Sequence, residues 1–369
     1  MCSKISKILD CFSPDIVNKG RQDELDIAKG MAIIFMVWCH SLRSLGGDTK
    51  SILGYFVDGV LGGPFAAPVF MISMGIGIKF SHRTTSKYMA IRGLKLFFYA
   101  YLLNFCRYTL PTLILYLITR KDEYISRLGE DFGEVDILQF AGISFILFAF
   151  FKKISLPDYI LLIIADLFSL AGTILKDVST NITWLDCILG IFWKAQNRAY
   201  FTLFHWFIFP VAGYFIGDLI KRCNDKKFAY LYCIIVFFPI GAIIEIILII
   251  FGFGLTSDIT EYFYMTLLDA FFLITFVVAW FGILFLLRNC FPNGKIGFLQ
   301  KLSLHINSIF CIHWTIIGFI NIIRELIWAE KELNFFLAIP ISAAILIIST
   351  LIAIGNNIKK TIIKFLKKY

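Results

Sequence analysis

Apolar runs of about twenty residues recur along almost the whole chain, and short charged segments separate them. A run of this length spans the hydrocarbon core of a membrane when it forms an α-helix. Hydrophobic residues make up 59% of the sequence and charged residues 17%, which is outside the range of water-soluble domains. A β-barrel is excluded because the runs are continuous and do not alternate. The sequence therefore predicts an all-α, polytopic transmembrane helix bundle.

About ten helices are expected from these runs, with both termini cytoplasmic. The runs cover 25–45, 64–81, 88–118, 137–151, 157–175, 200–220, 229–253, 263–287, 302–322 and 334–356. With the N-terminus inside, about two thirds of the 35 lysines and arginines fall in inner segments, as the positive-inside rule requires. The run 88–118 is too long for one straight span, and we expect Pro111 to break it near the outer surface.

One membrane domain is expected, and the net charge of +9 records its orientation, so no nucleic-acid partner is predicted. The nine cysteines show no C-x-x-C spacing and predict neither a disulfide framework nor a zinc ribbon. Adjacent Cys39 and His40 point about 100° apart on a helix, so no metal site is expected there. The predicted divisions are a cytoplasmic segment 1–24, a transmembrane domain 25–356 and a basic cytoplasmic tail 357–369.

Two histidines are predicted to lie deep in the membrane. His40 follows Asp26 by 14 residues and Lys29 by 11 residues on one face of the first helix, which places it about 16 Å beyond Lys29. His313 follows Lys301 by 12 residues, which gives a similar depth of about 18 Å. Polar side chains at this depth are costly and are functional candidates. The alternative for each histidine is a hydrogen bond to a neighbouring helix.

A cluster of cationic side chains lies near the expected inner surface, formed by His82, Arg83, Lys87, Arg92 and Lys95. Such a cluster suits a phosphorylated ligand such as a nucleotide cofactor. Positive-inside topology with snorkelling to lipid phosphate is the alternative, and it is favoured for Arg83 and Lys87. Arg92 is deeper and is the better candidate for ligand binding.

Other polar groups interrupt the apolar runs, namely Asn104, Asp166, Glu245 and Asp269. They either line a cavity or have structural roles, and both alternatives stay open. The G-x-x-x-G of Gly213 and Gly217 favours close helix packing.

Two outer segments, 119–136 and 176–199, are the longest loops and carry acidic and aromatic residues. One interpretation is that an acceptor substrate binds to these loops. Anchoring at the membrane interface explains Trp184 and Trp193 equally well.

Short motifs resemble those of integral-membrane acyltransferases. ELDIAKG, followed by an apolar run ending at His40, is similar to the LD-x-x-[RK]-G opening of that superfamily. APVFMISMGIGIKFS, IRGLKLFFYAYLLN, VDILQFAGISFILF and FHWFIFPVAGYFIG resemble, in this order, helices of the branch that includes heparan-alpha-glucosaminide N-acetyltransferase. IGFLQKLSLHINSIFCIHWTII is closer to the penultimate helix of acyltransferase family three.

This sequence departs from those patterns at three places. Lys29 stands where arginine is common, and the doubled arginine of family three is the single Arg92. The segment before Asp58 lacks the histidine of the animal heparan enzyme. A catalytic role for His40 is therefore implied only by the pattern of the first helix.

The resemblance implies transfer of an acyl group, usually acetyl, from cytoplasmic acyl-CoA to a hydroxyl or amine of an outward-facing carbohydrate or glycolipid. It implies acetyl-CoA as co-substrate, no metal, membrane lipid as a partner and a bacterial cytoplasmic membrane location, with the oligomeric state open and a homodimer as one alternative. His40 would be the general base, and His313 would orient the acceptor or stabilise the oxyanion. The expected CoA-binding residues are Arg92, Lys95, Lys29 and Arg83. The expected supporting residues are Asp26, Asp58, Asn104, Asp166, Glu245 and Asp269.

The alternative function is a proton-coupled transporter or a lipid-linked-glycan flippase, with Asp166, Glu245 and His40 as a proton relay. Such transporters often contain repeats with broken helices, and the sequence shows no such symmetry. A structural or signalling membrane protein is a third alternative. The density of intramembrane charge argues against it.

Overall fold

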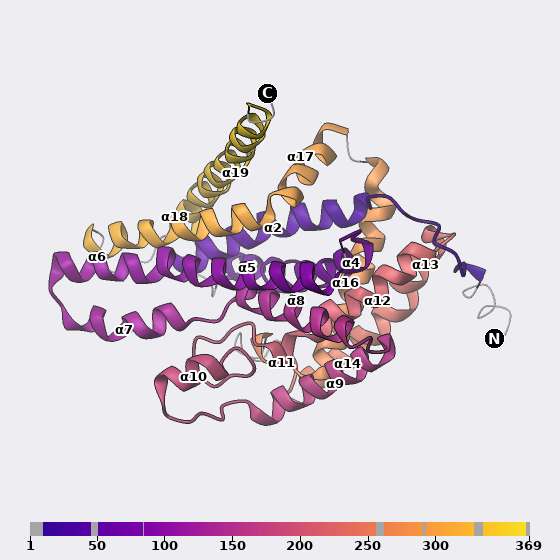
Figure 1. Cartoon of the computed structure of the whole chain (residues 1–369), viewed down its shortest axis with the longest axis horizontal. Coiled ribbons are helices and arrows are strands. Elements are labelled where there is room, and N and C mark those ends of the chain that lie inside the picture. Colours follow the sequence, from indigo (N-terminus) through magenta and orange to yellow (C-terminus); the bar gives the residue numbers. More distant parts are fainter. Residues whose placement is uncertain are drawn as a thin grey trace. The chain divides into compact units, whose positions relative to one another are not determined.

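The structure, a computed structural model, describes residues 10–45, 51–83, 85–255, 262–290, 293–327 and 335–366. In these ranges the chain forms helices and two isolated backbone bridges, so the all-α prediction is confirmed (Figure 1). Helices η1, η2 and η3 are π-helical and η4 is a 3₁₀ turn. The helices are α2 (Asp23–Ser44), α3 (Ile52–Tyr55), η1 (Phe56–Leu61), α4 (Ala67–Phe80), α5 (Ser86–Asn104), η2 (Phe105–Thr109), α6 (Leu110–Thr119), α7 (Asp122–Gly133), α8 (Ile137–Lys153), α9 (Asp158–Leu175), α10 (Thr183–Leu189), α11 (Leu203–Trp206), α12 (Ile208–Arg222), α13 (Lys226–Tyr232), η3 (Cys233–Phe237), α14 (Phe238–Ile250), α16 (Leu267–Leu287), η4 (Arg288–Cys290), α17 (Asn293–Leu304), α18 (Ile306–Ile327) and α19 (Phe335–Leu366).

Eight helical stretches within the described residues are long and apolar enough to cross a membrane. They are Asp23–Ser44, Ser86–Thr119, Asp158–Leu175, Leu203–Arg222, Lys226–Ile250, Leu267–Leu287, Ile306–Ile327 and Phe335–Gly355. The other two predicted spans, 64–81 and 137–151, correspond to α4 with 14 residues and α8 with 17 residues. The predicted polytopic helix bundle is therefore confirmed.

The predicted break at Pro111 is wrong, because α5, η2 and α6 form one helical stretch of 34 residues. Pro111 lies in the first turn of α6, directly after the π-helical turn Phe105–Thr109. In a regular α-helix its ring would clash with the carbonyl of Arg107, four residues earlier. The wider π-helical turn accommodates the proline without ending the helix. The same order recurs where η3 precedes Pro239 of α14.

The chain divides into two compact units, and each combines three stretches of sequence. The first contains Met1–Leu25, Pro68–Leu102 and Gly129–Cys290, and the second contains Asp26–Ala67, Leu103–Leu128 and Phe291–Tyr369. The first unit thus holds α8 to α14 and α16 together with most of α4 and α5. The second holds most of α2 together with η2, α6, α17, α18 and α19.

Glycines let helices of the first unit approach closely. A Cβ on Gly75 of α4 would overlap the backbone of α12, and one on Gly213 of α12 would overlap the backbone of Ile72. Gly93 on α5 and Gly142 on α8 face each other in the same way. The close packing predicted for Gly213 and Gly217 is confirmed, since a Cβ on Gly217 would likewise lie 3.1 Å from the Cα of Ile76 on α4.

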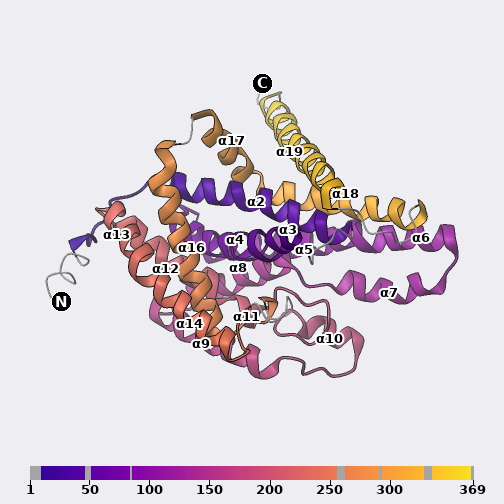
Figure 2. The same cartoon turned by 180° about the vertical axis from the view of Figure 1, so that it is seen from behind.

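In the second unit, helix α18 contacts α6, α17, α19 and the π-helical turn η2. Figures 1 and 2 both show α6 and α18 side by side. Buried Leu115, Tyr124 and Ile322 join α6, α7 and α18, and the Tyr124 hydroxyl donates a hydrogen bond of 2.6 Å to Glu325. A second apolar cluster, which includes Leu42, joins α2, η1 and α19. Helices distant in sequence are thereby fixed around α18.

Candidate functional site

The two histidines predicted to lie deep in the membrane meet inside the second unit. Nδ1 of His40 on α2 lies 3.0 Å from Nε2 of His313 on α18. Their rings are nearly parallel, with centroids 5.3 Å apart and an interplanar angle of 10°. His313 is fully buried and His40 is partly buried. The structure therefore brings together the two residues that sequence depth alone had paired.

The hydrogen bonds give this histidine pair a direction. Nδ1 of His313 lies 3.0 Å from the Ile309 carbonyl oxygen, which only accepts hydrogen bonds, so this nitrogen carries a proton. In a neutral His313, Nε2 is then an acceptor, and Nδ1 of His40 donates to it. In a neutral His40 the remaining nitrogen, Nε2, keeps its lone pair. Nε2 of His40 is thus the nitrogen of the pair that can accept a proton.

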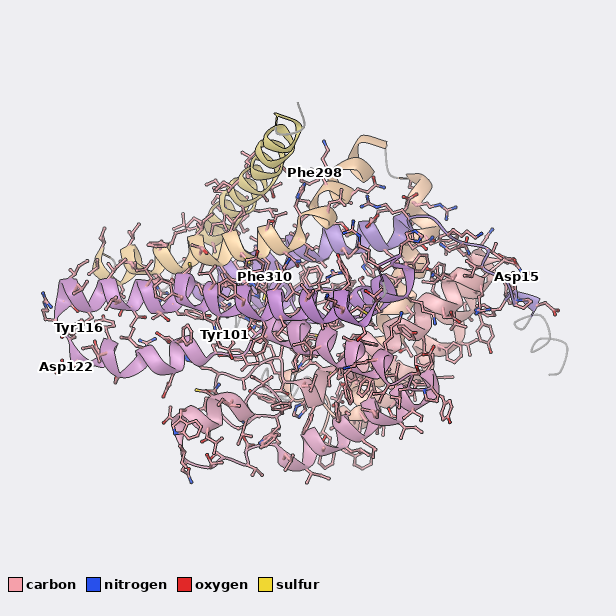
Figure 3. All side chains as sticks on the ribbon, viewed as in Figure 1. Asp15, Tyr101, Tyr116, Asp122, Phe298 and Phe310 are labelled. Atoms are coloured by element: carbon pink, nitrogen blue, oxygen red, sulfur yellow. The ribbon has the colours of Figure 1, made fainter. Side chains whose placement is uncertain are left out.

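Aromatic rings enclose the histidine pair. The Trp314 ring stacks on His40 with centroids 4.4 Å apart. Phe310, labelled in Figure 3, lies edge-on to both imidazoles, at 6.4 Å from His40 and 5.5 Å from His313. These apolar walls restrict the directions from which a polar substrate or water can approach the imidazoles.

A buried arginine that the sequence analysis missed lies beside the histidines. Arg107 in η2 is only 1% exposed and donates a hydrogen bond of 3.0 Å to Oδ1 of Asn104. Its guanidinium lies 4.5 Å from the Tyr108 ring centroid and 4.8 Å from that of Trp314. It also interacts electrostatically with both imidazoles. The N-x-x-R spacing inside an apolar run was the available signal.

The predicted supporting residue Asp58 ties η1 to the end of α2. It is buried, forms an ion pair with Arg43 and accepts a hydrogen bond of 3.1 Å from the Cys39 thiol. Arg43 was not among the predicted residues. Because Cys39 precedes His40 directly, this cluster fixes the backbone from which the His40 side chain projects.

Asp26 and Lys29 form a structural contact at the other end of α2. Nζ of Lys29 lies 3.0 Å from Oδ1 of Asp26, which also accepts a hydrogen bond of 2.9 Å from Ser303 on α17. Gly30 permits this approach, since a Cβ there would overlap the backbone of Leu299. Lys29 stays partly exposed.

The other predicted CoA-binding cations belong to the first unit. Arg92 is exposed and its guanidinium lies 4.4 Å from the Phe145 ring centroid. Arg83 lies 5.7 Å from the ring centroid of Tyr88, and Lys95 is exposed. All three cations lie on α5 or in the turn before it, and each is at least partly exposed.

A cavity of about 450 Å³ lies next to the start of α9 in the first unit, and we name it the Lys79 cavity. Its lining includes the lysines Lys79 and Lys152, the aromatic residues Phe148 and Tyr214, and Met89. Met89 and Phe148 are each three residues, about one helical turn, from Arg92 and Phe145. Nζ of Lys79 forms ion pairs with Oδ2 of Asp158 at 3.4 Å and with Oδ1 of Asp218 at 3.2 Å, and these fix its position.

Two of the three predicted acids of the first unit, Glu245 and Asp269, form a side-chain hydrogen bond with each other. Asp166 lies on an exposed face of α9. Glu245 is buried and accepts a hydrogen bond of 2.8 Å from the backbone N–H of Leu255. Asp269 forms a capping box with Thr266, accepting bonds of 2.7 Å from its N–H and its hydroxyl at the start of α16. Asp269 thus caps α16 and also contacts Glu245, and the two predicted alternatives for these acids both stay open.

The two predicted outer loops form one pocket of about 320 Å³ in the first unit, named the Lys194 pocket. Its polar wall includes Glu130, Asp177, Asp186, Lys194, Asn197 and Arg198. A parallel bridge between Val135 and Ala199 and an ion pair between Arg198 and Asp131 join the loops. The pocket is therefore built from two segments that are far apart in sequence.

Asp186 shapes one side of the Lys194 pocket. Its carboxylate accepts hydrogen bonds of 2.8 Å from the backbone N–H and from the hydroxyl of Thr180. These bonds hold the pKa of Asp186 below its usual value. The turn before α10 is thereby fixed while this residue is ionised.

The family of the chain follows from comparison with known proteins. The model of the catalytic domain of heparan-alpha-glucosaminide N-acetyltransferase matches residues 21–251, well over half of the chain. The chain belongs to this family. Membership in this acetyltransferase family and the eight apolar helices make it an integral, multi-pass membrane protein. No curated protein and no solved structure matched it.

The match to the acetyltransferase family covers α2 to α14 and so includes His40, Asn104 and Arg107, whereas His313 and Trp314 lie beyond it. The resemblance of the α18 segment to acyltransferase family three stays a prediction. In the described part of the chain, no group of three or more histidine, cysteine or acidic residues is placed to hold a metal ion.

Proposed function

We propose that the protein transfers an acetyl group from cytoplasmic acetyl-CoA to a hydroxyl or amine of an outward-facing glycan, with Nε2 of His40 as the general base. The observation that carries the proposal is the directed hydrogen-bond chain from the Ile309 carbonyl through His313 to His40. A base oriented by a second group is the arrangement that acyl-transfer sites use. Family membership supports the reaction class.

In this mechanism, Nε2 of His40 removes the proton from the acceptor hydroxyl or amine as that group attacks the thioester carbonyl carbon. The new C–O or C–N bond forms and a tetrahedral intermediate results. The C–S bond then breaks, and the imidazolium returns the proton to the CoA thiolate. His313 acts on His40 by holding its tautomer, a narrower role than orienting the acceptor or stabilising the oxyanion. Activity should fall at acidic pH, because a protonated imidazole accepts no proton.

The Lys79 cavity is the proposed site for the nucleotide end of CoA. Its lysines attract phosphate, and Phe148 and Tyr214 offer apolar faces to an adenine ring. Arg92 lies one turn further along α5, and Arg83, Lys95 and Lys29 are further candidates for phosphate contact. The proposal puts Lys152 and Lys153, in the last turn of α8, on the cytoplasmic side together with both termini, as the positive-inside rule favours.

The Lys194 pocket is the proposed site for a sugar unit of the acceptor. Its volume of about 320 Å³ is in the range of small-molecule sites, and its carboxylate, amide and cationic groups suit hydroxyl-rich ligands. Replacing the lining residues Glu130 and Asn197 by Gln and Ala should raise KM for the glycan without changing KM for acetyl-CoA. Lys121→Ala, an exposed residue of the same outer segment, is the matched control.

The decisive experiment is acetyl transfer by purified protein in nanodiscs, with labelled acetyl-CoA and a panel of amino-sugar and neutral-sugar glycosides. His40→Gln should abolish transfer while gel filtration and thermal stability stay unchanged. His305→Gln, at the junction before α18, should keep wild-type rates. Full transfer by His40→Gln would refute its role as base. Proton-coupled sugar uptake in proteoliposomes without any acyl donor would instead support the transporter alternative.

A further inference from the structure

Three features of the second unit fix Arg107 in place. Its backbone belongs to the π-helical turn before Pro111. The backbone of Arg107 lies directly against Gly318 of α18, where a Cβ would overlap the Arg107 carbonyl oxygen. Asn104, one turn earlier, accepts a hydrogen bond from its guanidinium. The position of this side chain is therefore set by the π-helical turn, by α18 and by a neighbouring amide.

The guanidinium and the base are in contact with the same ring. Trp314 lies 4.8 Å from the Arg107 guanidinium and 4.4 Å from the His40 ring centroid. A positive charge and a basic nitrogen are thus fixed next to one another in a buried, largely aromatic site. An arginine stays protonated at all physiological pH values, and its N–H groups are strong donors to oxygen.

Cation–π contacts alone are the simplest explanation for a buried arginine. These contacts explain why the rings of Tyr108 and Trp314 lie against the guanidinium. They do not explain why an arginine is present here at all, because a charge inside a membrane domain is costly and is normally found where function needs it. Acyl transfer needs such a charge. The carbonyl oxygen of the thioester gains a full negative charge when the acceptor attacks, and a preorganised donor stabilises it.

We propose that Arg107 is the group that stabilises this oxyanion, an inference that rests on the proposed acetyl transfer. As the bond from the acceptor to carbon forms, the carbonyl π electrons move to oxygen, and a guanidinium N–H donates a hydrogen bond to that oxygen. No proton passes from Arg107. When the intermediate collapses, the C=O bond re-forms, the C–S bond breaks, and His40 supplies the proton to the leaving thiolate.

Kinetics of Arg107→Gln and Arg107→Lys test the inference. Loss of one oxyanion donor lowers kcat by roughly 10²- to 10³-fold. Arg107→Gln should show this loss with little change in the affinity for a non-hydrolysable acetyl-CoA analogue, and added guanidinium chloride at millimolar concentration should restore part of kcat. Arg107→Lys should lie between Arg107→Gln and the wild type. Arg120→Gln is the matched control, since Arg120 directly follows the same helical stretch and its guanidinium lies 5.9 Å from the Tyr116 ring.

The outcomes separate the inference from the proposed function. A wild-type protein without acetyl transfer refutes the function itself. Transfer by the wild type together with an unchanged kcat in folded Arg107→Gln refutes only the role of Arg107. If Arg107→Gln is unstable, analogue binding and guanidinium rescue are measured on Arg107→Lys instead. Weakened analogue binding together with a rate that guanidinium does not restore would contradict an oxyanion role.

Discussion

His313 contributes to the site through both of its ring nitrogens, because one bonds the Ile309 carbonyl and the other faces Nδ1 of His40. We predict that His313→Leu lowers kcat by at least about 10²-fold, since His40 then loses the acceptor that fixes its tautomer. His313→Gln, whose amide oxygen can accept the same hydrogen bond, should lose less. Steady-state rates with KM for acetyl-CoA unchanged would establish a positioning role. Equal loss in both variants would contradict it.

The positions of His40 and His313 along their helices could be predicted, because each residue adds a constant rise, and their depth in the membrane stays a prediction. Their hydrogen bond could not be predicted, since it depends on how α2 and α18 are rotated toward each other in the folded unit. Arg107 was missed because its side chain is stabilised by residues such as Trp314 that are remote in sequence. Lys29 shows the reverse case, as its main contact is the local ion pair with Asp26.

The contact between α18 and η2 depends on Gly318. A Cβ there overlaps the Arg107 carbonyl oxygen, so we predict that Gly318→Ala destabilises the protein by about 1–3 kcal/mol and lowers transfer by moving Arg107. Gly297→Ala on α17 is the matched control, because among the described residues no atom beyond its chain neighbours and its own helix backbone lies within 4 Å of a Cβ there. Thermal unfolding in detergent and the transfer rate measure the two effects. Equal stability of both variants would show that the helices adjust freely.

Helix α7 is joined to α18 through the hydroxyl of Tyr124. Its hydrogen bond to Glu325 raises the pKa of Tyr124 to about 12, so the folded state favours the neutral phenol. The bond therefore contributes stability below the unfolded pKa of about 10, and this contribution is lost as the pH rises from about 10 to 12.

From this sign we predict that Tyr124→Phe is less stable than the wild type by about 1 kcal/mol at pH 8 and that the difference shrinks above pH 10. Thermal unfolding between pH 8 and pH 11 measures it. Tyr159→Phe, which changes an exposed tyrosine, should show no difference at pH 8. A gap between Tyr124→Phe and the wild type that grows with pH would contradict the assignment.

At the scale of the whole chain, each of the ten predicted runs is largely helical where the structure describes it, because hydropathy is a local property of the sequence. The continuous stretch through Pro111 was mispredicted, since the π-helical turn that accommodates the proline leaves no simple sequence mark. The division into two units was not predictable either. Each unit combines three separate stretches, so its membership is decided by tertiary contacts and not by runs along the chain.

Within the first unit, α9 separates the two cavities. Lys152 and Asp158 line the Lys79 cavity at the start of α9, whereas Asp177 and Lys194 line the Lys194 pocket after its end, and 18 helical residues span about 27 Å. The proposed function requires the Lys79 cavity and the Lys194 pocket to face opposite sides of the membrane, and the length of α9 is sufficient for this. A cysteine introduced at Asn197 in a cysteine-free variant should react with an impermeant maleimide added outside intact cells, and one at Lys153 should react only after permeabilisation. Labelling of Lys153→Cys from outside would invert the topology and with it the assignment of the two cavities.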